Sequence, residues 1–145
     1  MTGAARGTRR TVLAALAAGA MAATVERALA GPRRADPRLL GTWRSDGERT
    51  ARFWRYTEEP DAARRRDFER LLGKLTRRFT ETHVYGEFEG DTWSDEYWVV
   101  DADARSVVVA YRDDSAYTLQ QIFFEKDSMY LVAGYNFEFF RRVGP

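Results

Sequence analysis

The sequence contains no cysteine among its 145 residues. This absence excludes disulfide bonds, thiolate metal ligands, thiol nucleophiles and redox switching at cysteine. Small domains that work outside the cytoplasm often depend on disulfides for stability. This chain must therefore depend on the packing of its core.

Histidine is nearly absent, since His83 is the only one. One histidine cannot form the usual multi-histidine zinc site. In an extended strand the Cα atoms of His83 and Glu87 lie about 13 Å apart, too far for the carboxylate to orient the imidazole. We interpret His83 as an exposed strand residue, with a hydrolase built around it as the alternative. Because the sequence also lacks a nucleophile elbow, a P-loop and a dinucleotide-binding motif, we expect no enzyme and no cofactor.

Lysine is rare, and arginine supplies nearly all of the positive charge. Residues 31–145 carry 19 basic and 21 acidic side chains, a net charge of about −2. A nucleic-acid-binding domain presents a basic face, so we expect no nucleic-acid partner. The run Arg64–Arg66 could bind an anion, but Asp61 stands four residues before Arg65, which is typical of a solvated helix face.

Long hydrophobic runs are also missing, because a membrane-spanning helix needs roughly 20 apolar residues. The most apolar stretch, residues 12–25, follows Arg9 and Arg10 and precedes the small-residue sequence Ala28-Leu29-Ala30. This order is typical of a signal peptide, and the paired arginines resemble a twin-arginine export signal. We predict that residues 1–30 are removed near Ala30. The mature protein is then periplasmic or secreted and has no stable membrane span, with general secretion as the alternative route.

Aromatic residues are abundant, and all 20 lie at or after Trp43. Aromatic side chains favour strands, and hydrophobic alternation with period two predicts an antiparallel meander joined by short turns. About eight strands in this order can close into a barrel. Two prolines in residues 31–38 predict a flexible lead-in before one domain, residues 39–145, which we expect to be monomeric. The predicted strands are 39–45, 49–56, 76–81, 83–89, 93–101, 105–112, 117–125, 128–134 and 137–142.

One helix is predicted over residues 60–75, after the first strands. Pro60 suits the first helical turn, and Asp61 suits the positive end of the helix dipole. Apolar residues follow at the helical spacing and form one stripe. These are Phe68, Leu71, Leu72 and Leu75.

The two ends of the predicted domain resemble the lipocalin-like, or calycin, family of β-barrels. Gly41-Thr42-Trp43 opens the first strand, and Arg141-Arg142 follows the last one. The resemblance implies that Arg141 or Arg142 stacks on Trp43 and closes one end of the barrel. The chain also looks like a group of uncharacterised exported bacterial proteins. Those proteins begin with a Leu-x-Gly-Thr-Trp-x-Ser-Asp motif, as in residues 39–46, and end in an aromatic-Arg-Arg-Val sequence, as in residues 140–143.

The chain departs from lipocalins in two ways, because its helix is early and cysteine is absent. An early helix is similar to that of fatty-acid-binding proteins, whose helices cover the mouth of the barrel. Those proteins hold a carboxylate with an Arg-x-Tyr pair in the last strand. This chain has Arg141-Arg142-Val143 there, so that site does not carry over.

Two functions fit these patterns. In the first, the barrel binds a small apolar or amphipathic ligand in a lumen lined by Trp54, Phe79, Trp98 and Phe123, with the helix as its lid. A lumen filled by its own side chains is the alternative.

In the second, the protein is an interaction module, such as an inhibitor of an extracellular hydrolase, and acts through surface loops. An acidic tip around Gly90 motivates this possibility. Clustered carboxylates also occur in calcium sites and glycosidases, but the EF-hand spacing is missing and we expect no metal. The tip comprises Glu87, Glu89, Asp91, Asp95 and Glu96.

Overall fold

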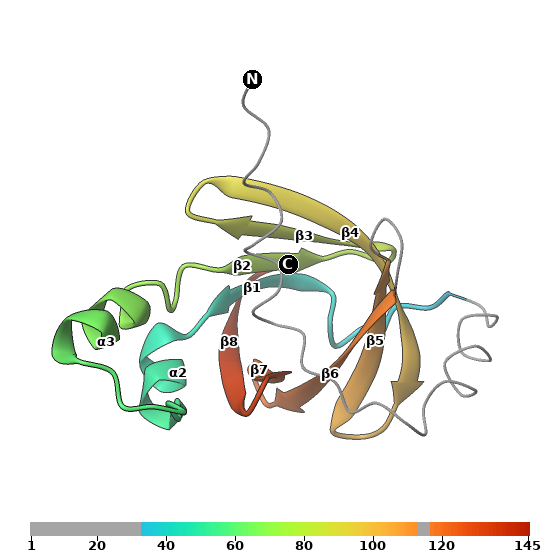
Figure 1. The fold of residues 1–145 in the computed structure, drawn as a ribbon. Helices are drawn as coiled ribbons and strands as arrows, with labels where there is room; N and C mark the ends of the chain where they lie inside the picture. Colours follow the sequence, from blue (N-terminus) through green and yellow to red (C-terminus); the bar gives the residue numbers. More distant parts are fainter. Residues whose placement is uncertain (1–32, 113–116) are drawn as a thin grey trace.

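The protein forms a closed barrel of eight antiparallel strands, with two short helices between the first strand and the second (Figure 1). The computed structural model describes residues 33–112 and 117–145. The predicted signal peptide, residues 1–30, lies outside the described residues. The strands are β1 (Gly41–Ser45), β2 (Thr76–Phe79), β3 (His83–Phe88), β4 (Asp91–Ala102), β5 (Ser106–Arg112), β6 (Tyr117–Glu125), β7 (Ser128–Ala133) and β8 (Asn136–Gly144), and the helices are α2 (Gly47–Phe53) and α3 (Ala62–Glu69).

Every strand pairs with the next one along the chain, and β8 returns to pair with β1. At this closing contact Trp43 lies opposite Arg142, and Ser45 lies opposite Phe140. An up-and-down order with turns of a few residues is the topology that the sequence predicts. The prediction of a mainly β, closed antiparallel barrel is therefore confirmed.

Residues 49–56, predicted as a second strand, contain no strand, because residues 49–53 belong to α2 and residues 54–56 follow it, so that prediction is wrong. The side chain of Asp46 accepts a hydrogen bond from the backbone N–H of Arg49 at 3.0 Å and caps the helix. Such a cap satisfies a donor that the first helical turn leaves without a partner. The alternating Ala51 and Phe53 indicated a strand, but the local bonds of Asp46 favour the helix.

The helix predicted over residues 60–75 is real but shorter, since α3 ends at Glu69. Asp61 caps it by accepting hydrogen bonds from the N–H groups of Ala63 and Arg64. Gly73 follows with φ of 83°, in the left-handed region that favours glycine. Leu75 is then buried in the barrel core. The predicted apolar stripe is therefore divided between a helix and a barrel.

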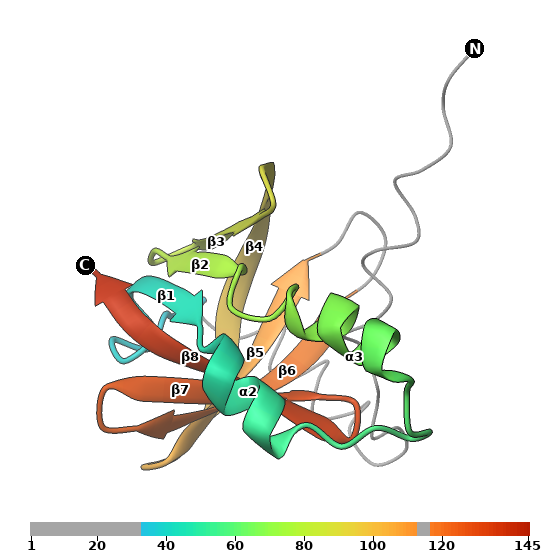
Figure 2. The ribbon, with the colours of Figure 1, turned by 90° about the vertical axis from the view of Figure 1, so that its left-hand side faces the viewer.

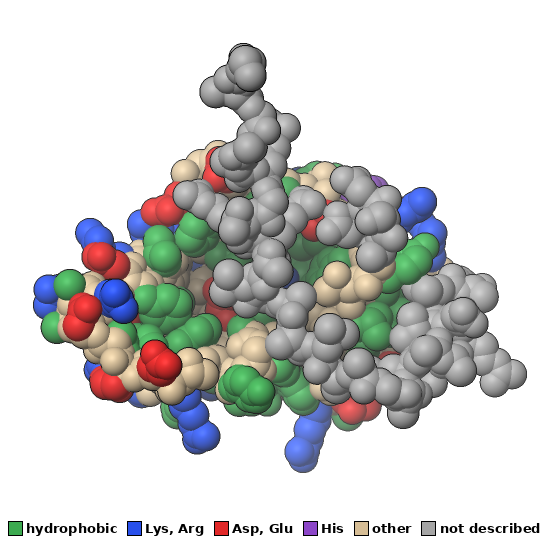
Figure 3. Space-filling model, in the orientation of Figure 1, with side chains coloured by type: hydrophobic (Ala, Val, Ile, Leu, Met, Phe, Trp, Pro, Cys, Tyr) green, Lys and Arg blue, Asp and Glu red, His purple; other side chains and the backbone are tan. Residues whose placement is uncertain are grey.

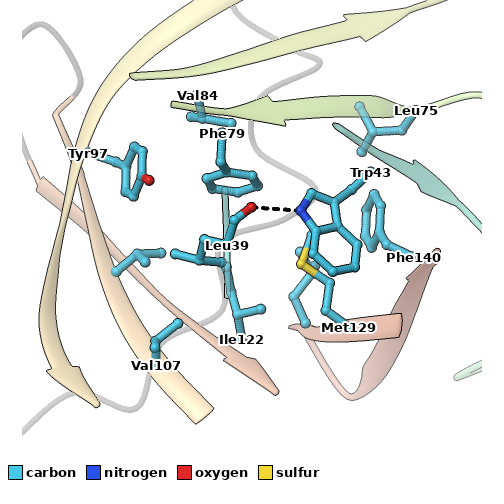
Figure 4. Packing of buried hydrophobic residues seen from close by; sticks show 12 residues of the cluster. Leu39, Trp43, Leu75, Phe79, Val84, Tyr97, Val107, Ile122, Met129 and Phe140 are labelled. Atoms are coloured by element: carbon cyan, nitrogen blue, oxygen red, sulfur yellow. Dashed lines mark hydrogen bonds between the residues drawn. The ribbon is translucent and has the colours of Figure 1, made fainter. Parts of the chain in front are cut away.

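The core runs through the barrel interior, from Leu39 just before β1 to Leu75 just before β2. Inward side chains from most of the strands meet there, together with Leu39 just before β1 (Figure 4). Trp43 lies between Leu39, Met129 and Phe140, and its indole Nε1 donates to the carbonyl of Leu39 at 2.7 Å. The buried cluster comprises Leu39, Trp43, Leu75, Phe79, Val84, Tyr97, Val107, Val109, Ile122, Met129, Leu131 and Phe140.

Residues 33–38, predicted as a flexible lead-in, lie against the barrel. The backbone N–H of Val99 donates to the carbonyl of Arg34 at 2.9 Å. Arg33 forms an ion pair with Glu96, and its guanidinium lies 4.8 Å from the ring centre of Trp98. The segment before β1 therefore lies beside β4.

Candidate functional site at the polar end of the barrel

One end of the barrel is sealed by Arg142. Its guanidinium lies 4.3 Å from the ring centre of Trp43. It also donates hydrogen bonds to the carbonyls of Arg38, at 2.8 Å, and Leu40. A Cβ at Gly41 would lie 2.5 Å from Arg142 Nη1, so the seal requires glycine there. Of the two arginines that the sequence offered for this contact, Arg142 makes it.

The opposite end, where β1 finishes and β2 begins, has a different lining. In Figure 2 this end faces the viewer, and both helices lie at it. Strand alternation directs Arg77 inward because it lies two residues from buried Phe79. The same alternation directs Glu138 inward beside Phe140. With Ser45 on β1, Tyr111 on β5 and Gln120 on β6, these residues form what we call the inner polar cluster.

Gln120 is the centre of the hydrogen bonds in this cluster. Its side-chain oxygen accepts from Arg77 Nη1 at 3.1 Å and from the hydroxyl of Tyr111 at 3.2 Å. The guanidinium of Arg77 lies 5.8 Å from the ring centre of Phe140. The cluster therefore rests directly on the apolar core.

Glu138 is the most deeply buried charged residue of the cluster, with a side chain that is 8% exposed. Burial raises the pKa of its carboxyl, while Arg77 and a hydrogen bond from Ser45 act in the opposite direction. Burial also raises the pKa of the Tyr111 hydroxyl. The Arg77 guanidinium is always a hydrogen-bond donor.

Exposure differs between the two ends. Inward side chains at the sealed end are closed off from solvent, as in Met129 at 0% and Phe79 at 2%. Arg77, Tyr111 and Gln120 are only partly buried. The inward side chains at the end beside the helices are therefore less completely buried than those at the sealed end.

The helices give this end a charged border. In Figure 3, acidic and basic side chains gather over α2 and α3, and hydrophobic side chains lie between these helices and the barrel. Phe53 of α2 packs on Phe139 of β8, with ring centres 5.6 Å apart. Phe68 of α3 packs on Trp54 and Tyr56.

The four aromatic residues predicted to line a lumen do not come together. Phe79 points inward and is buried. Trp54 packs on Phe68 at 4.9 Å, beyond α2. Trp98 and Phe123 alternate with the inward residues on their strands and so lie on the outer face. There Phe123 stacks on Tyr130 at 4.9 Å.

His83 and most of the acidic tip lie at the surface, but Asp95 shares the inward parity of buried Tyr97 on β4 and helps to raise the pKa of Tyr111. His83 Nδ1 and the Thr82 hydroxyl are 2.9 Å apart, and the ring lies beside Tyr85. Glu89 in the tip pairs with Lys74 at 2.7 Å. Within residues 33–112 and 117–145, no group of three or more His, Asp or Glu side chains is placed to hold a metal ion.

A groove of about 550 Å³ lies on the outside of β2, β3 and β4. Its lining includes Arg78, Tyr85 and Glu87, which alternate with the inward residues of their strands. Arg78 stacks on Tyr85 at 4.6 Å. The groove therefore lies mainly on the outer face of these strands, although Gly86 and Trp93, which share the inward parity, also line it.

The sequence reasoning missed the inner polar cluster, although a signal for part of it exists. Phe79 marks an inward position, and Arg77 shares its parity, so the pair Arg77-Arg78 divides into one inward and one outward arginine. On β6 both faces carry large apolar groups. Parity therefore gave no reason to place Gln120 inside.

No protein-family model matches the chain, and searches of curated protein sequences and of solved structures return no match. Among the residues that the structure describes, no helix has the length and hydropathy needed to cross a membrane. The fold alone defines the class, which is a closed, eight-stranded antiparallel β-barrel consistent with a lipocalin-like fold.

Proposed function

We propose that this protein is an exported, lipocalin-like binding protein whose barrel takes a small apolar or amphipathic molecule. The observation that carries the proposal is the difference between the two ends of the barrel. One end is sealed by Trp43 and Arg142. The other presents partly exposed, inward-facing polar side chains around Arg77 and Gln120.

The inner polar cluster is costly for a purely structural barrel. Charged groups inside a protein lose hydration, and apolar side chains of similar size often give equal or greater stability. An eight-stranded barrel has room for its own side chains or for one small ligand. Because Trp43 and Arg142 close the other end, the ligand occupies the end beside α2 and α3.

Export rests on the sequence of residues 1–30. Paired arginines, a moderately apolar segment and the Ala28-Leu29-Ala30 sequence together favour a cleaved signal. The absence of cysteine is compatible with a periplasmic or secreted protein whose stability comes from packing.

Mass spectrometry of the protein purified from the exported fraction tests both export and ligand binding. Under denaturing conditions, a mass beginning at or near Gly31 supports export, whereas an intact amino terminus contradicts it. Under native conditions, an additional mass of a few hundred daltons, on the order of a drug-sized ligand, supports binding. A protein without added mass that also fails to take up amphipathic probes would contradict the binding proposal.

A further inference from the structure

The outer surface of the barrel is polar on one side and apolar on the opposite side. β3 and β7 are four strands apart in a closed barrel of eight, so they lie on opposite sides of it (Figure 1). The outward residues of β2 and β3 include Arg78 and Glu87. Polar outward residues are usual for antiparallel strands whose other face lies in a core. β6, β7 and β8 do not follow this rule.

Apolar side chains fill neighbouring outward positions on β6, β7 and β8. Phe123, Tyr130 and Phe139 lie side by side on the three strands. Val132 and Phe137 form the next outward pair along β7 and β8. The ring centre of Tyr130 lies 4.9 Å from that of Phe123 and 5.5 Å from that of Phe137. We call these five residues the outer aromatic face.

Within residues 33–112 and 117–145, the elements that pack on the outer aromatic face cover only its margin. Phe53 of α2 packs on Phe139, and the guanidinium of Arg49 lies 4.2 Å from the same ring centre. Phe139 is therefore buried, whereas Phe137 is 43% exposed. Tyr135, in the turn two residues before Phe137, is 90% exposed. Contiguous apolar surface of this kind is typical of a face that contacts a membrane or another protein.

Cations border the outer aromatic face at both ends. Arg55 lies beside the β7–β8 turn, because its backbone N–H donates to the side-chain oxygen of Asn136 at 2.7 Å. Lys126 lies in the β6–β7 turn, and Arg141 is the next outward residue after the face on β8. None of these three cations forms an ion pair with another described residue. Asp127, next to Lys126, offsets one of the three charges.

We propose that the outer aromatic face, with Tyr135 at its edge, docks on an anionic lipid membrane. Aromatic side chains favour the boundary between headgroups and acyl chains, where the ring is in apolar surroundings and a tyrosine hydroxyl stays hydrated. Arg55, Lys126 and Arg141 then contact the anionic headgroups. The association is peripheral, and it does not depend on what the barrel binds inside.

A second copy of the chain fits the outer aromatic face less well than an anionic surface does. Arg55 stands at one end of the face, and Lys126 and Arg141 stand at the other. A two-fold pairing of two such faces places cations opposite cations in either orientation. Like charges in apposition disfavour an interface. An anionic membrane, in contrast, attracts both ends at once.

Sedimentation with lipid vesicles tests the proposal on protein purified from the exported fraction. We expect vesicles of phosphatidylglycerol to bind about 10- to 100-fold more tightly than vesicles of phosphatidylcholine, the effect of two or three basic residues near an anionic surface. The double variant Tyr135→Ser, Phe137→Ser should bind phosphatidylglycerol at least about tenfold more weakly, because two exposed rings are lost. Tyr85→Ser is the control. It removes a ring that is 40% exposed on the polar side of the barrel, and should bind as the wild type does.

A charge variant keeps the proposal testable if the serine variant folds poorly. Lys126→Gln with Arg141→Gln leaves every aromatic ring in place and should weaken binding to phosphatidylglycerol about tenfold, with little change for phosphatidylcholine. Lys74→Gln with Arg78→Gln removes the same charge from the polar side of the barrel. This control should stay within about twofold of the wild type. An equal loss in the two charge variants would overturn the proposal, because net charge alone would then explain binding.

Two other results would also overturn the proposal. One is a wild-type protein that binds neither kind of vesicle, or a Tyr135→Ser, Phe137→Ser variant that binds as the wild type does. The other is a wild-type dimer in size-exclusion chromatography that this variant dissociates, without vesicle binding by either protein. The face would then be a contact between copies of the chain. All variants have the same amino terminus, so residues 1–30, if retained, do not affect the comparison.

Discussion

At the scale of single residues, the seal of the barrel depends on one arginine and one tryptophan. Arg142 combines a stacking contact on Trp43 with hydrogen bonds to two backbone carbonyls. Arg141, its neighbour, is exposed and points away from the interior by alternation. Two adjacent arginines of the same strand therefore have different structural roles.

Arg142→Ala should lower the free energy of unfolding by about 1.5–3 kcal/mol, the range for hydrogen bonds to a charged group. Arg142→Lys should recover only part of this loss, because lysine lacks the planar fork that reaches both carbonyls. Arg141→Ala is the control and should stay within about 0.5 kcal/mol of the wild type. Urea unfolding measures all three, and equal effects at the two arginines would contradict the assignment.

Glu138 should make stability depend on pH in a defined direction. Burial raises the pKa of its carboxyl in the folded state above the value in the unfolded chain. The folded state then holds this proton more tightly. The resulting stability is fully present below the unfolded pKa, about 4.3, and is lost as pH rises through the folded pKa.

Glu138→Gln removes this dependence. We expect the variant to gain stability relative to the wild type as pH rises from about 4 upward. The comparison between the two proteins is needed because Asp36 acts in the opposite direction, since its hydrogen bond with Arg38 lowers its pKa. The free energies of unfolding of the wild type and of Glu138→Gln, measured at several pH values, test this prediction. A difference that does not change with pH would refute the prediction.

The residue-scale features could be predicted from the sequence only where two independent patterns agreed. Trp43 and an arginine after the last strand could be identified because they stand at the two ends of the domain. The roles of Arg77 and Glu138 could not be predicted. Alternation indicates which face of the sheet a side chain is on, but it does not indicate which groups form hydrogen bonds with a polar side chain that points inward. That depends on Gln120 and Ser45, which belong to other strands.

At the scale of elements, α2 is attached to the barrel by a buried hydroxyl. Thr50 is fully buried, and its Oγ1 accepts a hydrogen bond from the backbone N–H of Phe139 on β8 at 3.0 Å. Asp46, which caps α2, donates its own backbone N–H to the carbonyl of Phe139. The helix therefore continues the hydrogen bonding of β8 past the end of β1.

Thr50→Val should destabilise the protein by about 1–3 kcal/mol, the cost of leaving a buried donor without a partner. Valine preserves the shape, so the lost hydrogen bond dominates. Thr50→Ser, which keeps the hydroxyl, is the matched control and should retain most of the stability. Thermal or urea unfolding tests the pair, and a valine variant as stable as the serine variant would show that this bond contributes little.

The elements that sequence patterns predicted correctly are those with strong alternation and short turns. β6 coincides with its predicted range, residues 117–125. The turn at Glu89-Gly90 has φ values of 52° and 90°, as a tight hairpin requires. α2 was missed because seven residues are too few to show a helical period. Its stability comes from β8, which is distant in sequence.

At the scale of the whole molecule, the closing contact between β1 and β8 determines both stability and the site. It removes the free edges that β1 and β8 would otherwise present. It also brings Ser45 opposite Phe140, and so places the polar end of β1 beside Glu138. The seal and the inner polar cluster are thus two ends of the same strand pair.

Two truncated chains distinguish the effect of opening the barrel from the effect of shortening the chain. A chain ending at Arg142 keeps the seal and the pairing of Trp43 with Arg142, whereas a chain ending at Phe140 loses both. The longer variant should lose at most about 1 kcal/mol, the value of one backbone hydrogen bond. The shorter one should lose about 3–5 kcal/mol, from the arginine contacts and two further backbone bonds. That is a large share of the usual 5–15 kcal/mol of a domain.

The shorter variant should also associate, because β1 then presents unpaired N–H and C=O groups along its edge. Size-exclusion chromatography and urea unfolding measure both effects on the same samples. If the chain ending at Phe140 were monomeric and as stable as the chain ending at Arg142, closure of the barrel would not depend on the end of β8. The stability would then have to reside in the other strand pairs and in the core they enclose.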